Sequence, residues 1–527
     1  MERKEIRIQA GTSVPFHNGA DYCIGTGRMG LALQREYQEQ LALVQEEIGF
    51  AHIRGHGLFS DDMAIYQEYE EADGQKRAEY NFTYLDLVMD SYLRLGIRPF
   101  LELGFMPEKL ASGRQTVFYW KGNVTPPSDY GAWRALVQAT LRHLIGRYGA
   151  EEVTAWPVEV WNEPNLEGFW KDADREEYFK LFACTFAAVK EVDARFQVGG
   201  PAICGVQDEL WIRSFLEFCR AEGISPDFVT RHHYTTQVPE TAGHYGYAKL
   251  MPPEEGFANL ESSRRIIDSF PEFRGLPMHL TEFNTSYIPN CPLHDTNRNA
   301  AYIAGQLARL GETSESYSYW TFGDIFEEFG VPFTPFHGGF GLVANGGIPK
   351  PTFWTFRFFK ELQGVCVHRS QEAVIVRRPD GSYRGVVWNA TLDGTGRGRE
   401  LVFRLPMEGE TYCLLTETVD EETCNPLKCW HDMGEPSSLS ERQKKILREA
   451  ARPLVQTRQE QIRCVREIMR QKTDGEMPEA MQRKEECGLR EAAVTLTVAP
   501  NGVIYFEAAP VSLQPDRGYD YERAVRA

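Results

Sequence analysis

The sequence predicts an α/β protein, a (β/α)8 TIM barrel with a C-terminal β-sandwich accessory domain. Between residue 20 and about residue 322, eight short apolar segments alternate with longer helix-patterned stretches. After Trp354 the pattern changes to β-hairpins. Eight strand-helix alternations over roughly 300 residues fit the usual size of such a barrel. An open doubly wound sheet is the rival arrangement.

The barrel elements follow in order along the chain. We expect its strands at residues 22–25, 51–56, 99–103, 158–161, 198–201, 228–234, 278–283 and 317–322. The amphipathic stretches between them predict helices over residues 31–48, 84–95, 132–148, 176–192 and 299–310. Together these elements predict a barrel domain over residues 15–350.

The remaining residues, 351–527 together with 1–14, predict the β-sandwich-like accessory domain. Segments 373–377 and 383–389 flank Pro-Asp-Gly, and segments 494–498 and 503–507 flank Pro-Asn-Gly. Strand-patterned segments joined by such turn residues predict β-hairpins. Between the two pairs, residues 438–492 are charged and helix-patterned, which predicts a solvated helical insertion.

Composition limits the classes of function. A net charge of −18 over 527 residues argues against nucleic acid, whose phosphates require clustered Lys and Arg. The N-terminus mixes charges, and the chain has no apolar run near ~18 residues, so we expect a cytoplasmic protein without a membrane partner. The 11 cysteines lack metal-site spacing and predict reduced thiols. A homo-oligomer is left open.

Two glutamates stand at the ends of predicted strands. Glu163 lies in Trp-Asn-Glu-Pro-Asn at residues 161–165, where Pro164 is expected to hold it in extended geometry as the fourth strand becomes a loop. Glu282 lies near the end of the seventh strand. Taken singly, Glu163 fits an ordinary surface turn better, and Glu282 fits a salt-bridged glutamate equally well. Because all barrel strands end on the same face, the two carboxyls can meet across one cleft.

Two carboxyls in a chain with 12% aromatic residues suit cleavage of a glycosidic bond. One must protonate the leaving oxygen, and the other must present an anion to the oxocarbenium-like centre. An ordinary Glu titrates near ~4.3, so the acid needs a pKa raised toward roughly 6 to 7 by burial or by a charged neighbour. We therefore expect the pair to hold different protonation states at one pH.

Residues 25–30 offer a competing interpretation, because they fit Gly-x-Gly-x-x-Gly and precede a predicted helix. A dinucleotide site would need a firm preceding strand and an acidic residue about 20 positions on. The preceding strand is short, although Glu46 and Glu47 lie near the right distance. The motif alone is weak, and we favour the barrel.

Six stretches, in order and at matching spacing, carry a resemblance. They are Gly-Thr-Gly-Arg-Met-Gly at 25–30, Ile-Arg-Gly-His-Gly at 53–57, Trp-Asn-Glu-Pro-Asn-Leu at 161–166, Arg-His-His-Tyr at 231–234, Leu-Thr-Glu-Phe-Asn at 280–284 and Gly-Asp-Ile-Phe-Glu-Glu at 323–328. The chain resembles glycoside hydrolase family 39, in particular its bacterial β-xylosidases. The resemblance implies a retaining exo-glycosidase with a catalytic barrel, which removes β-linked xylose from the non-reducing ends of xylo-oligosaccharides.

The resemblance also implies the roles of individual residues. Glu163 would be the general acid/base and Glu282 the nucleophile. The residues implied to bind the sugar are Asn162 at its 2-hydroxyl, His56, His232 and Tyr234 lining the same subsite, Trp320 as a stacking platform, and Glu328 at its hydroxyls. Chemistry alone does not separate Glu327 from Glu328. No metal and no organic cofactor are implied.

Two alternatives stay open. The first is an α-L-iduronidase or another retaining glycosidase of the same clan; an iduronidase must hold a sugar carboxylate, which Glu328 would repel. The second is a non-catalytic sugar-binding barrel, which requires neither carboxyl. For a retaining enzyme we expect the two carboxyls roughly 5 to 5.5 Å apart, and a separation near ~9 Å would indicate inversion.

Overall fold

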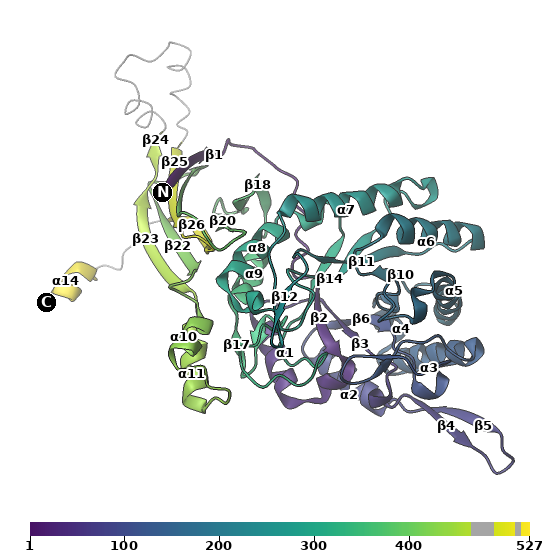
Figure 1. The fold of residues 1–527 in the computed structure, drawn as a ribbon. Helices are drawn as coiled ribbons and strands as arrows, with labels where there is room; N and C mark the ends of the chain where they lie inside the picture. The colour runs from purple at the N-terminus through teal and green to yellow at the C-terminus, as the bar shows by residue number, and fades with distance from the viewer. Residues whose placement is uncertain (465–489, 512–517, 527) are drawn as a thin grey trace.

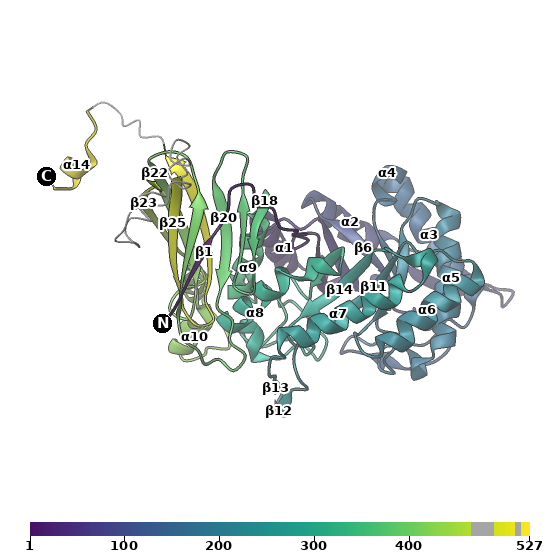
Figure 2. The ribbon, with the colours of Figure 1, turned by 90° about the horizontal axis from the view of Figure 1, so that it is seen from above.

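The computed structural model describes residues 1–464, 490–511 and 518–526. A closed barrel wrapped by helices lies beside two stacked β-sheets, and both the first strand and the last strands of the chain belong to those sheets (Figures 1 and 2). Within the described residues, no helix is long and apolar enough to cross a membrane.

The barrel contains all eight predicted strands. They are β2 (Cys23–Arg28), β3 (His52–His56), β6 (Arg98–Leu103), β9 (Val158–Val160), β10 (Val198–Ile203), β11 (Phe228–Tyr234), β14 (Met278–Asn284) and β15 (Ser316–Tyr319). Every neighbouring pair is parallel, and β9 pairs with β10 as well as β6, so the circle closes. The barrel prediction is therefore confirmed, and the doubly wound alternative is wrong.

Helices surround the barrel. They are α1 (Arg35–Glu47), α2 (Thr83–Arg94), α3 (Tyr130–Tyr148), α4 (Ala150–Val153), α5 (Arg175–Val192), α6 (Asp208–Glu222), α7 (Pro253–Asp268), α8 (Asn297–Leu307) and α9 (Pro351–Lys360). Five of these match the predicted stretches, whereas α4, α6, α7 and α9 had not been predicted. In α6, Trp211, Phe215 and Cys219 are buried at four-residue spacing, which gives this helix one apolar face against the barrel.

The connections between strands and helices carry short elements of their own. The 3-10 turns are η1 (Met29–Leu33), η2 (Asp61–Met63), η3 (Glu108–Leu110), η4 (Lys171–Ala173), η5 (Pro271–Phe273), η6 (Pro292–Asp295) and η7 (Leu310–Glu312). The small hairpins are β4 (Tyr66–Glu70) with β5 (Lys76–Tyr80), β7 (Thr116–Val117) with β8 (Gly122–Asn123), β12 (Glu240–Ala242) with β13 (Tyr245–Tyr247), and β16 (Val343–Ala344) with β17 (Ile348–Pro349).

The other two sheets pack face to face as a sandwich. One sheet has the order β1 (Glu2–Arg7), β21 (Arg399–Pro406), β25 (Arg490–Val498) and β24 (Arg463–Cys464). The second has the order β18 (Val365–Arg369), β19 (Ala373–Arg377), β20 (Tyr383–Trp388), β26 (Val503–Val511), β22 (Thr411–Val419) and β23 (Leu454–Gln461). Buried residues from both sheets, including Phe403 and Phe506, form their shared core. The predicted accessory sandwich is therefore present.

The outer face of the six-stranded sheet packs against the barrel through α9. Phe358 stacks on Tyr505 with ring centroids 5.6 Å apart, and Phe359 lies 6.3 Å from Trp388. On its other side, α9 places Phe356 5.1 Å from Tyr319 of β15. A common apolar core therefore joins barrel strand β15 to the six-stranded sheet of the sandwich.

Two expectations about the sandwich differ from the structure. The segments flanking Pro-Asn-Gly do not form a hairpin, because β25 and β26 belong to opposite sheets and the turn carries the chain from one sheet to the other. Helix is present at α10 (Pro426–Asp432) and α11 (Glu441–Ala450), and a last helix, α14 (Tyr521–Arg526), lies near the C-terminus. Residues 454–461, predicted as helix, form β23 because they pair with β22. Residues 465–489 of the predicted insertion lie outside the described part of the chain.

Candidate active site

The segment after β9 turns its side chains into the barrel mouth by an unusual backbone conformation. Trp161 has φ 72° and Glu163 has φ 45°, both in the left-handed region that non-glycine residues rarely adopt. The expectation that Pro164 holds Glu163 in extended geometry is therefore wrong. Instead, the Glu163 N–H donates to the Ala202 carbonyl oxygen of β10 at 2.8 Å, which fixes the turn from the neighbouring strand. Backbone strain of this kind clusters at functional sites.

The structure brings Glu163 and Glu282 together. His232 lies between them, with Nδ1 2.8 Å from Glu163 Oε1 and 3.3 Å from Glu282 Oε2. One oxygen from each carboxyl and one nitrogen of His232 all lie within 4.8 Å of one another. Glu163 is 8% exposed and Glu282 4% exposed. The short separation suits double displacement and leaves no room between the carboxyls for the water that an inverting enzyme needs.

Burial and neighbouring charge shift the pKa values of Glu163 and His232 in opposite directions. Burial first, and then the carboxylates of Glu282 and Glu328, raise the pKa of Glu163 well above its ordinary value. Burial, together with the charge of Arg54, holds the pKa of His232 well below its usual value. Glu163 therefore keeps its proton to higher pH than a free glutamate, beside a neutral imidazole.

Glu282 has the opposite surroundings, because donors and a cation face it. Arg54 Nη1 donates to Glu282 Oε1 at 2.8 Å, and the Tyr234 hydroxyl donates to Glu282 Oε2 at 2.7 Å. Such contacts stabilise negative charge on a carboxyl. The two glutamates thus sit in different environments, since carboxylates surround Glu163 whereas a cation and a hydroxyl donate to Glu282, and acid and nucleophile require such a contrast.

Arg54 is a functional residue that sequence reasoning missed. Its fully buried guanidinium also donates to Glu159 Oε2 at 2.5 Å and to the Asn162 side-chain oxygen at 2.9 Å, and lies 3.0 Å from Glu102 Oε2. Burial opposes its charge, but the surrounding carboxylates outweigh that effect and raise the pKa of Arg54. The sequence did contain a signal for this cluster, because Arg54, Glu102 and Glu159 are charged residues within otherwise apolar strands of the barrel.

The contact between Arg54 and Asn162 orients a donor toward the site. Because the Asn162 oxygen accepts from Arg54, its amide NH2 group remains free to donate. Asn162 is buried directly beside Glu163. Its amide is therefore a fixed donor next to the carboxyl pair, as binding of a sugar hydroxyl requires.

His56 and Trp320 lie beside the same carboxyl pair. His56 Nδ1 lies 2.7 Å from Glu102 Oε2, its Nε2 lies 3.6 Å from Glu282 Oε1, and its ring centroid is 4.6 Å from that of Trp320. Gly25 makes room for Trp320, because a Cβ atom there would lie 2.5 Å from the indole ring. The Gly-x-Gly-x-x-Gly stretch thus runs from strand β2 into the 3-10 turn η1, and its first glycine packs against a site aromatic, so the dinucleotide interpretation is wrong.

The structure separates Glu327 from Glu328. Arg28 donates to Glu327 Oε2 from Nη2 at 2.7 Å and from Nε at 3.2 Å. Burial first, and then the charge of Glu282, raise the pKa of Glu328 well above its ordinary value. Glu328 thus feels the charge of Glu282, whereas Glu327 is paired with Arg28.

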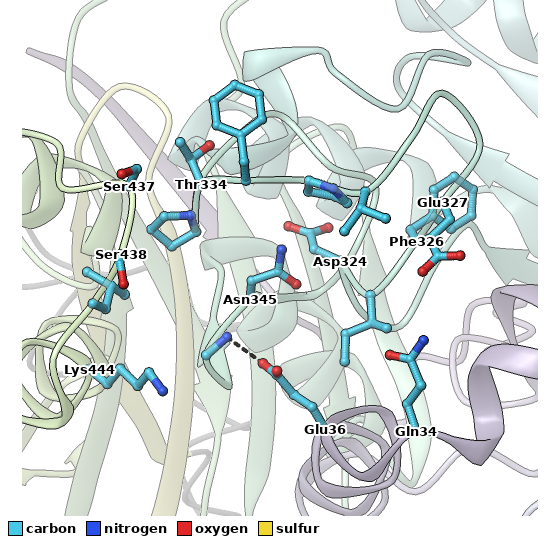
Figure 3. A pocket seen from close by; sticks show the side chains of 17 residues that line it. Gln34, Glu36, Asp324, Phe326, Glu327, Thr334, Asn345, Ser437, Ser438 and Lys444 are labelled. Carbon is cyan, nitrogen blue, oxygen red and sulfur yellow. Dashed lines mark hydrogen bonds between the residues drawn. The ribbon is translucent and has the colours of Figure 1, made fainter. Parts of the chain in front are cut away.

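The loop that carries these two glutamates also lines a hollow of about 370 Å³. Glu327 and Phe326 line it together with Gln34 and Glu36 of the α1 region and Lys444 of α11 (Figure 3). Figure 3 also shows Glu36 accepting from the backbone N–H of Gly346 at 2.9 Å. The loop after β15 thus carries Glu328 and also borders the accessory domain.

Within the described part of the chain, Glu163, His232 and Glu282 form a group that could hold a metal ion, since one atom of each lies within 4.8 Å of the others. The surroundings do not fit that use. Arg54 already places a positive charge 2.8 Å from Glu282, and a second cation there would be repelled. The chemistry of this group is that of a carboxyl pair.

Comparison with known proteins agrees with this geometry. Residues 5–465 match the family model of glycosyl hydrolases family 39. The chain is 50% identical over 460 residues to a β-xylosidase of Geobacillus stearothermophilus, covering 86% of this chain and 90% of that protein. It is 35% identical over 440 residues to a β-xylosidase of Caldicellulosiruptor saccharolyticus, covering 80% and 86%.

Solved structures give the same result. A monomeric β-xylosidase from Caulobacter crescentus CB15 superposes with a TM-score of 0.82 at 30% identity, covering 97% of this chain and all of that one. Among the sequence matches, a more distant relative is an α-L-iduronidase of Canis lupus familiaris. It is 28% identical over 242 residues, which cover 44% of this chain and 33% of that protein.

Proposed function

The chain belongs to glycosyl hydrolase family 39, and we propose that it is a retaining β-xylosidase whose general acid/base is Glu163 and whose nucleophile is Glu282. The substrate is a β-linked xylosyl unit at the non-reducing end of a short xylo-oligosaccharide. The observation that carries this proposal is the contrast between the two buried carboxyls. Glu163 lies near other carboxylates, whereas Glu282 accepts hydrogen bonds from the guanidinium of Arg54 and the phenol of Tyr234.

In the first step Glu282 attacks the anomeric carbon as the glycosidic bond breaks. Glu163 gives its proton to the leaving oxygen, so the aglycone departs as an alcohol and the xylosyl unit becomes an ester on Glu282. His232 Nδ1 lies 2.8 Å from Glu163 Oε1. In the tautomer that carries its proton on Nδ1, the neutral imidazole donates to Oε1 and leaves the other Glu163 oxygen to carry the transferred proton. The Asn162 amide binds the 2-hydroxyl, a contact that strengthens in the transition state.

In the second step a water molecule takes the place of the aglycone. Glu163, now an anion, accepts a proton from the water while the water oxygen attacks the anomeric carbon and the ester bond to Glu282 breaks. Arg54 and Tyr234 stabilise the carboxylate that is released. Two inversions give xylose with the configuration of the substrate.

Neither alternative fits the site as well. An α-L-iduronidase needs a cation for the sugar carboxylate, but Arg54 is already bound to carboxyls and Arg28 to Asp62 and Glu327. A non-catalytic sugar-binding barrel needs neither the pairing of the carboxyls nor their opposed environments. Xylose release from a terminal unit is the function that the geometry supports best.

The test is a panel of aryl β-xyloside, α-L-arabinoside, β-glucoside and α-L-iduronide, with the anomer of the first product followed by NMR. We expect preferential hydrolysis of the xyloside with retention. Preference for the iduronide, an inverted first product or silence on every glycoside would each contradict the proposal. A homo-oligomer and a cytoplasmic location stay predictions; light scattering on the purified protein tests the first.

A further inference from the structure

The loop that follows β6 contains a four-residue turn, which lies next to His56 of the site. The register of β7 and β8 pairs Val117 with Gly122, so residues 118–121 form the tip. Phe118 has φ 65° and Lys121 has φ 62°, two left-handed non-glycine residues in a single turn. A turn that tolerates this strain is held in place by contacts elsewhere, and such strain is enriched at functional sites.

The contacts of Phe118 connect the tip to the site. Its ring stacks on His56 with centroids 5.8 Å apart at 21°, and on Trp120 with centroids 5.4 Å apart at 28°. Trp120 in turn packs over Gly57, immediately after His56, where a Cβ atom would lie 3.2 Å from the indole. Phe118 is only partly buried and packs at the edge of the barrel core, so its ring presents apolar surface beside His56.

The tip is also tied to the opposite loop of the barrel. The Tyr119 N–H donates to the backbone carbonyl oxygen of Glu328 at 2.7 Å. In the barrel, β2 and β3 lie between β15, which precedes Glu328, and β6, which precedes the turn. This hydrogen bond therefore joins the loop after β6 to the loop after β15, across the ends of β2 and β3.

The direction of the substrate follows from the position of Glu163. The leaving group must lie at Glu163, which follows β9, and β15 is four strands from β9 in either direction around the circle. The far end of the bound sugar therefore points toward the loop after β15, where Glu328 lies. A chain that continued from that end would meet the bridge between Tyr119 and Glu328.

We propose that the turn at residues 118–121, with Phe118 as its specificity-determining residue, closes the glycone end of the site and restricts cleavage to a single terminal sugar. This inference rests on the proposed β-xylosidase function. It assigns the exo preference to a wall built by two loops rather than to the carboxyl pair, so opening the wall changes which bond is cut while the chemistry is retained.

The experiment uses an aryl β-xylobioside, whose first products distinguish the two modes of cleavage. Terminal cleavage releases xylose and leaves aryl β-xyloside, whereas internal cleavage releases xylobiose and the aryl alcohol. Two variants open the wall: Phe118→Gly, which suits the left-handed backbone and removes the ring, and replacement of residues 118–121 by Asn-Gly, a two-residue hairpin turn. Lys121→Gly is the matched control, because it changes a left-handed, exposed residue of the same turn.

We expect both wall variants to raise the ratio of xylobiose to xylose among the first products by about tenfold or more, the scale on which apolar pocket contacts discriminate substrates. The wild-type protein and Lys121→Gly should give xylose first. Unchanged products from a folded Phe118→Gly protein would overturn the inference, as would an effect confined to the preference for the aryl group. If the wild-type protein fails to hydrolyse the aryl β-xyloside, the proposed function itself is wrong, and the inference falls with it.

Discussion

Arg54 Nη1 lies 2.8 Å from Glu282 Oε1, and neither side chain is more than slightly exposed. The contact gives Glu282 a positive neighbour that cannot lose its proton near neutral pH. Among the residues that the structure describes, none gives Glu163 such a permanent cation within hydrogen-bonding distance, and its carboxyl instead meets a neutral imidazole. The different roles that we propose for the two glutamates therefore rest on the difference in their neighbours.

Replacing Glu163 by Gln should affect substrates according to how much their leaving groups need a proton. For aryl β-xylosides with basic leaving groups we expect kcat/KM to fall by about 10² to 10⁴, the usual contribution of general acid catalysis. Dinitrophenyl β-xyloside, whose leaving group needs little protonation, should lose far less in this step. Equal losses across the whole leaving-group series would show that Glu163 is not the acid.

The pH dependence of kcat/KM should follow the raised pKa of Glu163. Its pKa is raised well above the ordinary value of a glutamate by burial and by the carboxylates of Glu282 and Glu328. The acid is active only while protonated, so activity should fall as pH rises through that raised pKa, well above pH ~4.3. In the Glu163→Gln variant this basic limb should disappear. A basic limb that survives the substitution would have to belong to another group.

Asn162 should act through the 2-hydroxyl of the sugar. Asn162→Ala removes the free amide donor, and we expect kcat/KM for an aryl β-xyloside to fall by roughly tenfold to a hundredfold, as for a lost hydrogen bond of ~1.5 to 3 kcal/mol. The same substitution should cost little with the 2-deoxy substrate. Equal losses on both substrates would instead point to a role in packing against Arg54.

Lys350 should matter for stability more than any exposed lysine. Its buried ammonium lies 2.6 Å from Asp295 Oδ1 and 2.6 Å from Asp324 Oδ2. Lys350→Met leaves two buried carboxyls without their cation, and such losses cost about 3 to 5 kcal/mol. The matched control is Lys76→Met, which breaks an exposed pair with Glu68 that water already screens, so it should lower the stability far less. Equal midpoints in denaturant for the two variants would contradict this assignment.

The strand ends could be predicted because they depend on local pattern. Val158–Val160 and Met278–Asn284 are apolar runs, and the barrel topology then requires Glu163 and Glu282 to share a face. The left-handed turn at Glu163 could not be predicted from Pro164, because the hydrogen bond that fixes it comes from Ala202 on another strand.

The misses share one cause, since each depends on tertiary pairing. The role of Arg54 can be recognised only once the fold brings Glu102 and Glu159 into contact with it inside the barrel. In the same way, Pro-Asn-Gly at 500–502 has the composition of a hairpin turn, but the long pairings of β25 with β21 and of β26 with β22 draw its flanking strands into different sheets.

The most direct test of the central claim is to trap the covalent intermediate. The protein would be incubated with an activated 2-deoxy-2-fluoro-β-xyloside, which slows both steps but leaves the first one faster, and the labelled peptide would be sequenced by mass spectrometry. We predict a single fluoroxylosyl adduct per chain, carried by Glu282. An adduct on Glu163, or steady turnover of a wild-type enzyme that never forms an adduct and releases inverted product, would contradict the account.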